Sequence, residues 1–512
     1  MSEKTQRRKK LLKKGWEVGS YATGYALGGG VGQVLTLYYM SFLMFAMQID
    51  PLSAALILGV TKVWDGFIDP AIGVLVDKTK SRFGSCRKWI LISIVPIFIT
   101  YFMLWYNFGI TSTSGKIAYF LIAQLLFSTA SSLGTVPYEA LLPRMVDGYK
   151  ERINYSSFRT VFSGIANVAS TYIYAALIHA KEPDDYLLYQ KEFAIMGLVL
   201  GAMFAIPMLI TFLGSKEKII NTKPENLSVK GVFKDYAEIL KSKLFRKCFL
   251  LSMLGSFISY AASIALTIFV LLTYSDLDVK IIGITLSLIF LVVNIKGAFE
   301  IGFFVPNIVM MKKRNKHFPF LVDLPILVAG CIILLFTTPE THLAVFFIGI
   351  ALFGAGTSCL SFVPNVLMPD LPDIDELMYG KRREGANGGL VTLGRQVTSG
   401  LAFLIFGVVL TLLNLNEDNA STAQYTPQNI AALKIMLCAI PIIGGAVMFF
   451  ISRTYNLDDK SHALIKAKIA EKREKGSVDF SKDERVLLEK ITGTEYNRLW
   501  IAKEDVVQTA IE

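Results

Sequence analysis

The sequence predicts an all-α membrane protein, a polytopic bundle of about twelve transmembrane helices in two six-helix halves. Hydrophobic residues make up 53% of its 512 residues and charged residues only 18%, whereas soluble domains carry about 25% charged residues. The apolar residues gather into about a dozen runs, each near the length that crosses a bilayer. These long, intact runs exclude the alternating pattern of an outer-membrane barrel.

The predicted helices follow one another along the chain. A basic segment at residues 1–19 precedes the first apolar run, which is too long for a cleaved secretion signal and is therefore taken as a spanning helix. The N-terminal half occupies 20–214, a polar central loop 215–243, and the C-terminal half 244–452. With ends good to about four residues, the expected spans are 20–47, 52–77, 88–108, 117–143, 155–180, 191–214, 245–274, 280–311, 318–338, 342–369, 384–414 and 430–452.

Residues 453–512 are hydrophilic and form a predicted cytoplasmic tail. Within it, Ala463–Lys475 and Glu484–Ile491 show the charge pattern of helices. A solvated tail is the simpler interpretation, and a docking or regulatory tail is the alternative.

The distribution of basic residues predicts the topology. The net charge is +11, and basic clusters flank alternate gaps between the apolar runs, while the intervening gaps are acidic or neutral. This alternation follows the positive-inside rule and places both termini in the cytoplasm of a multi-pass protein of the plasma membrane. It does not form the single basic face of a nucleic-acid-binding domain. The clusters are Lys4–Lys14, Lys78–Lys88, Lys216–Lys247, Lys312–Lys316 and Lys381–Arg383.

An imperfect internal repeat supports two related halves. Ser131–Pro137 in the fourth expected span matches Ser358–Pro364 in the tenth, and each is followed by acids and a basic turn. Two six-helix halves with glycine- and proline-broken helices describe the major-facilitator architecture, in which substrate binds near the bilayer midplane between the halves. The first span, dense in glycine, fits this architecture, although helix packing alone also favours glycine.

Charged residues inside a span usually face a cavity, because they are costly in lipid. Asp65 and Asp69 in the second span are four residues apart and share one helix face, with Lys62 a turn earlier. Two close carboxylates in a low dielectric favour a shared proton or a bound cation. A structural salt bridge to Lys62 is the alternative, but one lysine cannot neutralise both acids.

Further polar residues mark a possible substrate path. Ser132 and Thr135 lie beside Pro137, where hydroxyl groups either bind a cation or satisfy the backbone. Glu139 can pair with Arg159 across helices or contact a substrate. Lys296 and Glu300 are spaced to neutralise each other, so a structural pair is favoured for them. Arg395 and Gln396 belong to a polar patch in the eleventh span.

The sequence contains no recognisable enzyme or metal motif. It has no P-loop, HExxH or GxSxG with triad partners, and its histidines lie at span ends or in the tails. The five cysteines are scattered without CxxC spacing. No metal, cofactor or enzymatic activity is therefore expected, and transport would draw on an ion gradient.

Three motifs in order carry a family resemblance over about residues 15–450. They are Trp64–Pro70 continuing through Asp77–Gly84 to Trp89; Pro137–Leu141 through Arg152 to Arg159; and Asp370, Asp373, Glu376, Arg382 and Glu384. Together they resemble the signatures of the glycoside–pentoside–hexuronide:cation symporters, which include the melibiose carrier. The resemblance implies a major-facilitator fold and cation-coupled sugar transport without a cofactor.

By this resemblance, Asp65 and Asp69 take the role of the paired cation-binding carboxylates, and Ser132 replaces a threonine. Ile68 stands where the melibiose carrier has asparagine. Its side chain cannot bind sodium, which favours the proton over sodium as the coupling ion.

The sugar-binding positions of the melibiose carrier fall on Gly30, Thr135, Glu139 and Gln396, with Arg395 beside the last. Only Arg159 is retained among the polar sugar contacts of the melibiose carrier, so the pocket is not one for melibiose. A uronic acid or glucuronide is then at least as plausible as a neutral sugar, with Lys296 as a further cation near the cavity.

The loop Asp77–Arg87 is predicted to clamp the inner ends of the halves through Arg82, which would pair with Asp147, Asp370 or Asp373. The leading hypothesis is a cation-coupled symporter (H⁺ or Na⁺) of a sugar, glycoside or sugar acid that works by alternating access. Its partners are the small-molecule substrate, the coupling cation and the lipid bilayer, with no nucleic acid. A carrier of lipid-like substrates is the alternative, and a membrane-embedded transferase a distant third.

Overall fold

The computed structural model describes residues 14–146, 149–178, 189–217, 229–274, 278–281, 284–314, 316–338, 340–381, 383–413, 427–455, 457 and 459–502. These residues form two compact units. The first contains described residues within 1–227, 263–294 and 399–435, and the second contains those within 228–262, 295–398 and 436–512. Eleven helical spans among the described residues are long and apolar enough to cross a membrane.

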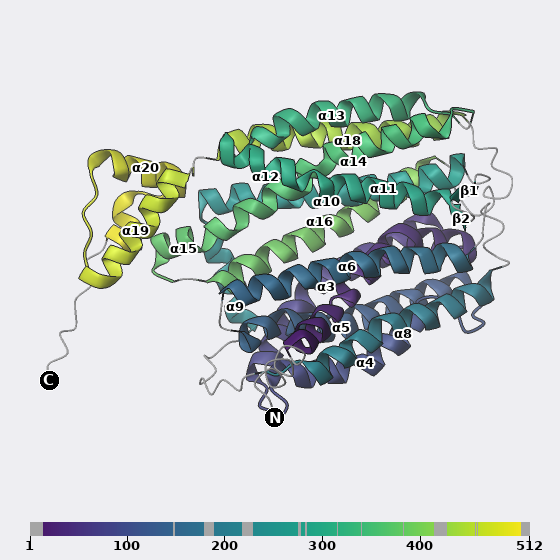
Figure 1. Ribbon diagram of the computed structural model, residues 1–512, viewed down its shortest axis with the longest axis horizontal. Helices are drawn as coiled ribbons and strands as arrows, with labels where there is room; N and C mark the ends of the chain where they lie inside the picture. The colour runs from purple at the N-terminus through teal and green to yellow at the C-terminus, as the bar shows by residue number, and fades with distance from the viewer. Residues whose placement is uncertain are drawn as a thin grey trace, which may run out of the picture. The chain divides into compact units, whose positions relative to one another are not determined.

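Long helices form most of the first unit (Figure 1). They are α3 (Pro51–Lys78), α4 (Ser85–Met103), α5 (Thr113–Met145), α6 (Tyr149–Leu177) and α8 (Gln190–Gly214). Helix α4 packs against α5 and α8, and α3 packs against α5. The observed α3 and α8 begin and end within one residue of the predicted spans 52–77 and 191–214.

Local capping explains where α3 and α5 begin. Asp50 precedes α3 and its carboxylate accepts a hydrogen bond from the backbone N–H of Ser53 at 2.9 Å. Pro51 occupies the first helical turn, where its missing N–H costs nothing. Ser112 caps α5 in the same way by accepting from the N–H of Gly115. Each cap satisfies a backbone donor that a helix N-terminus leaves unpaired.

The first expected span, 20–47, is helical but irregular. It includes π-helical segments η1 (Leu27–Val31), η2 (Leu35–Tyr39) and η3 (Phe42–Ala46), and the short α2 (Gly32–Val34) lies between η1 and η2. Several of its glycines allow close helix contacts. A Cβ atom on Gly24 would lie 2.7 Å from a ring carbon of Tyr138. Glycine at this position therefore lets the first helix approach α5.

The eighth expected span, 280–311, is wrong at its N-terminal end. Residues at its start form an antiparallel hairpin of β1 (Asp278–Ile281) and β2 (Ile284–Ser287). Val279, Ile281 and Ile284 are β-branched, and such residues favour extended backbone. Hydropathy alone cannot separate a short apolar strand from the end of an apolar helix. The span then continues as α11 (Leu288–Gly302) and, after a break at Phe303, α12 (Phe304–Lys313).

The second unit contains further spanning helices and the helices of the tail. Helices α10, α11, α16 and α18 contribute residues to both units. Helices α13 and α14 pack along each other, and α12 contacts both. Beyond α14 the chain enters the short α15, against which α19 packs. The elements are α9 (Val229–Ile239), α10 (Lys243–Thr273), α13 (Phe318–Phe336), α14 (Leu343–Leu367), η4 (Met368–Asp370), α15 (Leu371–Tyr379), α16 (Glu384–Leu412), α18 (Pro427–Arg453), α19 (Asp459–Lys475), α20 (Lys482–Thr492), η5 (Tyr496–Arg498) and η6 (Trp500–Ala502).

The tail is folded onto α15 rather than solvated along its length. Helices α19 and α20 fall in the two stretches whose charge pattern predicts helices, and Ser481 and Glu484 form a capping box at the start of α20. Ile465, Ile469 and Leu488 of the tail are buried in one hydrophobic cluster with residues of α15. The tail therefore extends the core of the second unit.

Candidate cation and substrate sites

Two carboxylates of α3 face two hydroxyl groups of α5 in the first unit. Ser128 donates a hydrogen bond to Oδ1 of Asp65, and Ser132 donates to Oδ1 of Asp69 at 2.5 Å. Both pairs are separated by 63 residues along the chain, which shows that α3 and α5 run in the same direction with matched helical turns. We call these four residues the polar seam.

The polar seam contains more negative than positive charge. The ammonium group of Lys62 lies 3.4 Å from Oδ2 of Asp65. Among the described residues, no other ion pair involves a seam carboxylate. The side chain of Asp65 is 13% exposed and both serines are buried. One lysine balances one carboxylate, so the seam holds an excess negative charge whose desolvation favours a bound cation or proton.

Thr135 lies one turn from the seam but does not join it. Its hydroxyl donates a hydrogen bond to the backbone oxygen of Ser131 at 3.0 Å, which is the usual hydrogen bond of a threonine hydroxyl inside a helix. The sequence allowed the hydroxyl groups of Ser132 and Thr135 either to bind a cation or to hydrogen-bond with the backbone. In the structure, Ser132 contacts a seam carboxylate and Thr135 contacts the backbone.

Glu139 and Arg159 form the ion pair that the sequence suggested, between α5 and α6. The guanidinium of Arg159 also lies over the ring of Tyr25, 4.2 Å from its centroid. Glu139 is 48% exposed and Arg159 23% exposed at their side chains. The group thus combines an acid, a base and an aromatic ring with surface left open for a ligand.

Gly30 lies at a tight helix contact. A Cβ atom there would lie 2.7 Å from the ring of Phe204 and 3.1 Å from the backbone oxygen of Ala166. Ser170 also donates a hydrogen bond to the Gly30 oxygen at 3.3 Å. The space beside Gly30 is therefore filled by neighbouring helices.

The remaining predicted substrate residues lie in the second unit. Lys296 is 2.9 Å from Glu300, and Glu300 accepts a further hydrogen bond from Ser361 at 2.7 Å. The Lys296–Glu300 pair is thus formed as its spacing predicted. Arg395 is exposed and donates to the hydroxyl of Ser256 at 3.1 Å. Gln396 is half-buried on the same helix, α16.

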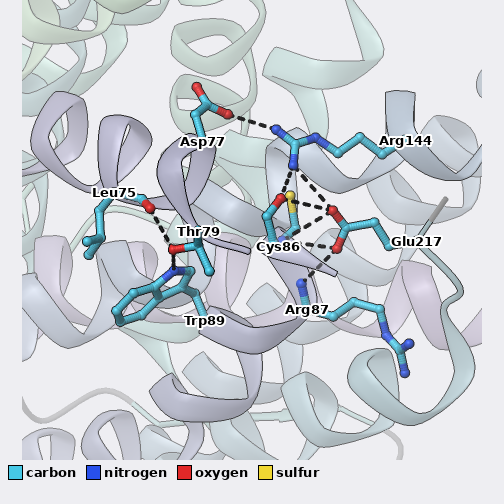
Figure 2. Close-up of polar contacts among 9 residues, drawn as sticks. Leu75, Asp77, Thr79, Cys86, Arg87, Trp89, Arg144 and Glu217 are labelled. Carbon is cyan, nitrogen blue, oxygen red and sulfur yellow. Dashed lines mark hydrogen bonds and ion pairs between the residues drawn. The ribbon is translucent and has the colours of Figure 1, made fainter. Parts of the chain in front are cut away.

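A second polar cluster lies at the ends of helices in the first unit (Figure 2). The carboxylate of Glu217, 2% exposed, accepts hydrogen bonds from the backbone N–H groups of Cys86 and Arg87 at 3.0 and 3.1 Å. It also accepts from Ser85 at 3.1 Å and pairs with Arg144 at 3.2 Å. Glu217 therefore caps the N-terminus of α4, where the helix dipole favours a negative charge.

Asp77, a predicted gating residue, joins this cluster through Arg144 at 2.8 Å. Arg82 instead lies over the ring of Phe83, 4.8 Å from its centroid. The proposed Arg82 partner Asp147 lies outside the described residues. The gating roles of Asp77 and Arg82 stay predictions.

Asp370 and Asp373 belong to an acidic segment that basic side chains of the second unit neutralise. Asp370 pairs with Lys316 at 2.7 Å, and Asp373, 3% exposed, accepts from His462 at 2.8 Å. Glu376 on α15 pairs with Arg473 of the tail. These contacts connect predicted gating residues to α19.

Sequence reasoning missed Ser128, Arg144 and Glu217. Ser128 could have been found, because it lies one turn before Ser132 as Asp65 lies one turn before Asp69. Glu217 lies in the polar central loop, where no local pattern distinguishes it from neighbouring charges. Its role depends on a contact with residues about 130 positions away.

A family model described as MFS/sugar transport protein matches residues 20–459. The chain belongs to this family. The family match and the eleven apolar spans make this MFS protein a multi-pass membrane protein of a transporter family, and solved structures support the major-facilitator fold.

The MFS protein is similar to several curated symporters. It is 32% identical over 176 residues to the sodium-dependent lysophosphatidylcholine symporter 1-A of Danio rerio, a match that covers 34% of this chain and only 32% of that protein. The match to the uncharacterized symporter sll1374 of Synechocystis likewise covers only 38% of that protein. By contrast, the match to the putative glycoside/cation symporter YagG of Escherichia coli, at 24% identity, covers 88% of this chain and 95% of YagG.

Solved structures support the fold of the MFS protein. A bacterial homolog of the human lysosomal transporter Spinster aligns with a TM-score of 0.63 at 13% identity, covering 86% of this chain and 97% of that chain. The nucleoside transporter NupG aligns with a TM-score of 0.56 at 14% identity, covering 86% and 98%. At these identities the similarity concerns the fold alone.

Proposed function

We propose that this protein is a secondary active symporter that couples H⁺ or Na⁺ to the movement of a sugar, glycoside or sugar acid by alternating access. It lies in the plasma membrane with both termini in the cytoplasm, as the alternating basic clusters favour. The observation that carries the proposal is the polar seam, in which two carboxylates and two hydroxyls face each other beside a single lysine.

The seam has the donor set of an ion-coupling site. A carboxylate inside a span needs a cation or a proton to offset its lost hydration, and it releases that ion when its surroundings change. Hydroxyl oxygens of Ser128 and Ser132 can serve as neutral ligands or as hydrogen-bond donors. Ile68, next to Asp69, offers no side-chain oxygen, which favours H⁺ over Na⁺.

The substrate half of the proposal rests on Glu139, Arg159 and Tyr25. An acid and an arginine hydrogen-bond hydroxyl or carboxylate groups of a ligand, and an aromatic ring packs against the apolar face of a sugar. Arg159 supplies bidentate geometry for a carboxylate, so sugar acids belong to the proposed substrates. The full-length similarity to YagG, a putative glycoside/cation symporter, supports this class.

A lysolipid is the second candidate substrate, and one structural feature favours it. An entirely apolar depression of about 510 Å³ is lined by one face of α6 and by Phe290 of α11. Such a surface suits an acyl chain rather than a sugar. The partial similarity to a lysophosphatidylcholine symporter points in the same direction.

Purified protein in liposomes tests both candidates. Uptake of a panel of sugars, glucuronides and lysophosphatidylcholine is measured under an imposed pH gradient or an imposed sodium gradient. Gradient-driven uptake of a sugar or sugar acid that Arg159→Gln abolishes supports the proposal. Val168 of α6 lines the apolar depression. Uptake of the lysolipid alone, with Arg159→Gln active and Val168→Asp inactive, selects the second candidate. No gradient-driven uptake of any compound contradicts both.

The Ser132→Ala variant tests the seam in the same liposomes. We expect a loss of coupled uptake, because the hydroxyl that contacts Asp69 is removed. Ser131→Ala is the matched control, since it removes the neighbouring hydroxyl on the same helix. Equal uptake by both variants would contradict a role of the seam.

A further inference from the structure

Three polar side chains meet in the interior of the second unit, on three neighbouring helices. Asn307 of α12, Asp323 of α13 and Ser358 of α14 are each 0% exposed. The amide nitrogen of Asn307 donates to Oδ2 of Asp323 at 2.8 Å and to the hydroxyl oxygen of Ser358 at 3.0 Å. Both amide hydrogens are thereby used, which fixes the orientation of the amide group.

Two acceptor atoms of this trio lack a hydrogen-bond donor. Oδ1 of Asp323 and Oδ1 of Asn307 are both buried and unsatisfied. A buried polar atom without a partner costs about 1–3 kcal/mol, and more for a charged group. Asn307 and Asp323 are hydrogen-bonded to each other, so their two unsatisfied oxygens require a common explanation.

The surroundings of Asp323 provide no positive charge. Among the described residues, no lysine, arginine or histidine forms an ion pair with it. The thiol and the backbone N–H of Cys359 on α14 also face Asp323, but neither makes a hydrogen bond of normal geometry with its Oδ1, while α12 contributes Asn307. Cys438 on α18 instead contacts Cys331, further along α13. An ionised carboxylate here would be an uncompensated charge inside a membrane span, which is strongly unfavourable.

We propose that Asp323 is a proton-binding site separate from the polar seam. A proton on Oδ1 makes this atom a donor toward Oδ1 of Asn307. The acid and the amide then form a closed ring of two hydrogen bonds, one from Asn307 to Asp323 and one back. One proton thus removes the charge and satisfies both unpaired oxygens.

This site ties the packing of α12, α13 and α14 to the protonation of one carboxyl group. Loss of the proton leaves a negative charge and an unsatisfied amide oxygen between three helices. The helices must then separate enough to admit water or a cation. The inference does not depend on which substrate the transporter carries, because none of its three residues is a proposed substrate residue.

Infrared spectroscopy of the purified full-length protein tests the proposal directly. A protonated carboxyl group gives a carbonyl stretch distinct from that of a carboxylate, and carbon-13 labelling of aspartate shifts it. We expect a label-sensitive band in the wild type at neutral pH that Asp69→Asn retains and Asp323→Asn removes. A spectrum in which Asp323→Asn loses no such band overturns the proposal.

Thermal unfolding of variants gives a second, independent readout. Asparagine at position 323 can donate to Asn307 and accept from it, so Asp323→Asn should match the wild type at neutral pH and exceed it at alkaline pH. Asp323→Leu should unfold at a lower temperature than the wild type at neutral pH, because it leaves the amide unpaired. A lower unfolding temperature for Asp323→Asn than for the wild type at every pH would overturn the proposal. If the variants fail to fold, the labelled wild type still decides, since a spectrum without a protonated aspartate band contradicts it.

Discussion

Replacing Glu217 by glutamine is predicted to destabilise the first unit. The carboxylate accepts from two backbone N–H groups, from Ser85 and from Arg144, and its side chain is only 2% exposed. Glutamine retains one acceptor oxygen and turns an amide N–H₂ toward donors, so about two of the four interactions are lost. Hydrogen bonds to charged groups contribute about 1.5–3 kcal/mol each. Allowing for the partial exposure of Arg144, we expect a loss of about 3 kcal/mol.

The free energy of unfolding, measured by denaturant titration in mixed micelles, checks this value. Glu495→Gln is the matched control, because Glu495 is 71% exposed and its ion pair with Arg498 lies at the surface. Such a surface pair contributes roughly 0–1 kcal/mol. A double-mutant cycle with Arg144→Gln isolates the ion pair from the helix cap. A Glu217→Gln loss no larger than that of Glu495→Gln would refute the capping role.

Four further predictions concern the connections between helices. Gly84→Ala should lower the unfolding temperature sharply in a thermal melt, since this residue has φ of +96° and a Cβ atom would overlap a carboxylate oxygen of Glu217; an unchanged melt contradicts this. Arg383→Gln should cost about 3 kcal/mol in the same titration, because it leaves Asp375, 3% exposed, without its bidentate partner. Arg383 donates a hydrogen bond to Glu238 that lowers the pKa of this carboxyl group. The Arg383–Glu238 pair therefore stabilises the fold near neutral pH, and this stabilisation is lost as the pH falls through the lowered pKa. The unfolding temperatures of the wild type and of Glu238→Gln should converge in acid. Deleting residues 457–512 should lower the unfolding temperature and expose α15 to protease, because the tail covers an apolar face of α15; equal protection would show that the tail does not hold it.

The membrane-spanning architecture could be predicted because it depends on local properties of the chain. Apolar runs and polar gaps mark each span independently of its neighbours, and α13 begins at the predicted residue, Phe318. The prediction failed where hydropathy does not report conformation. The hairpin at β1 and β2 is as apolar as a helix end, and only its β-branched residues distinguish it.

The candidate sites could be predicted in part, for reasons of spacing. Asp65 and Asp69 were found because a four-residue interval fixes two side chains on one helix face. Glu217 was not found because its partners come from other helices. Asp323 escaped notice because a single acid within an apolar run has no spacing partner, and its importance appears only with Asn307 and Ser358 around it.

The measurement that tests the central claim most directly compares accumulation with exchange in Asp65→Asn and Asp69→Asn. Each change removes one carboxylate charge from the polar seam while preserving the size of the side chain. Liposomes containing each variant are assayed for gradient-driven accumulation of the transported compound and for its exchange without a gradient. Coupling at the seam predicts that both single variants lose accumulation while exchange persists. Full accumulation by both variants would contradict the assignment.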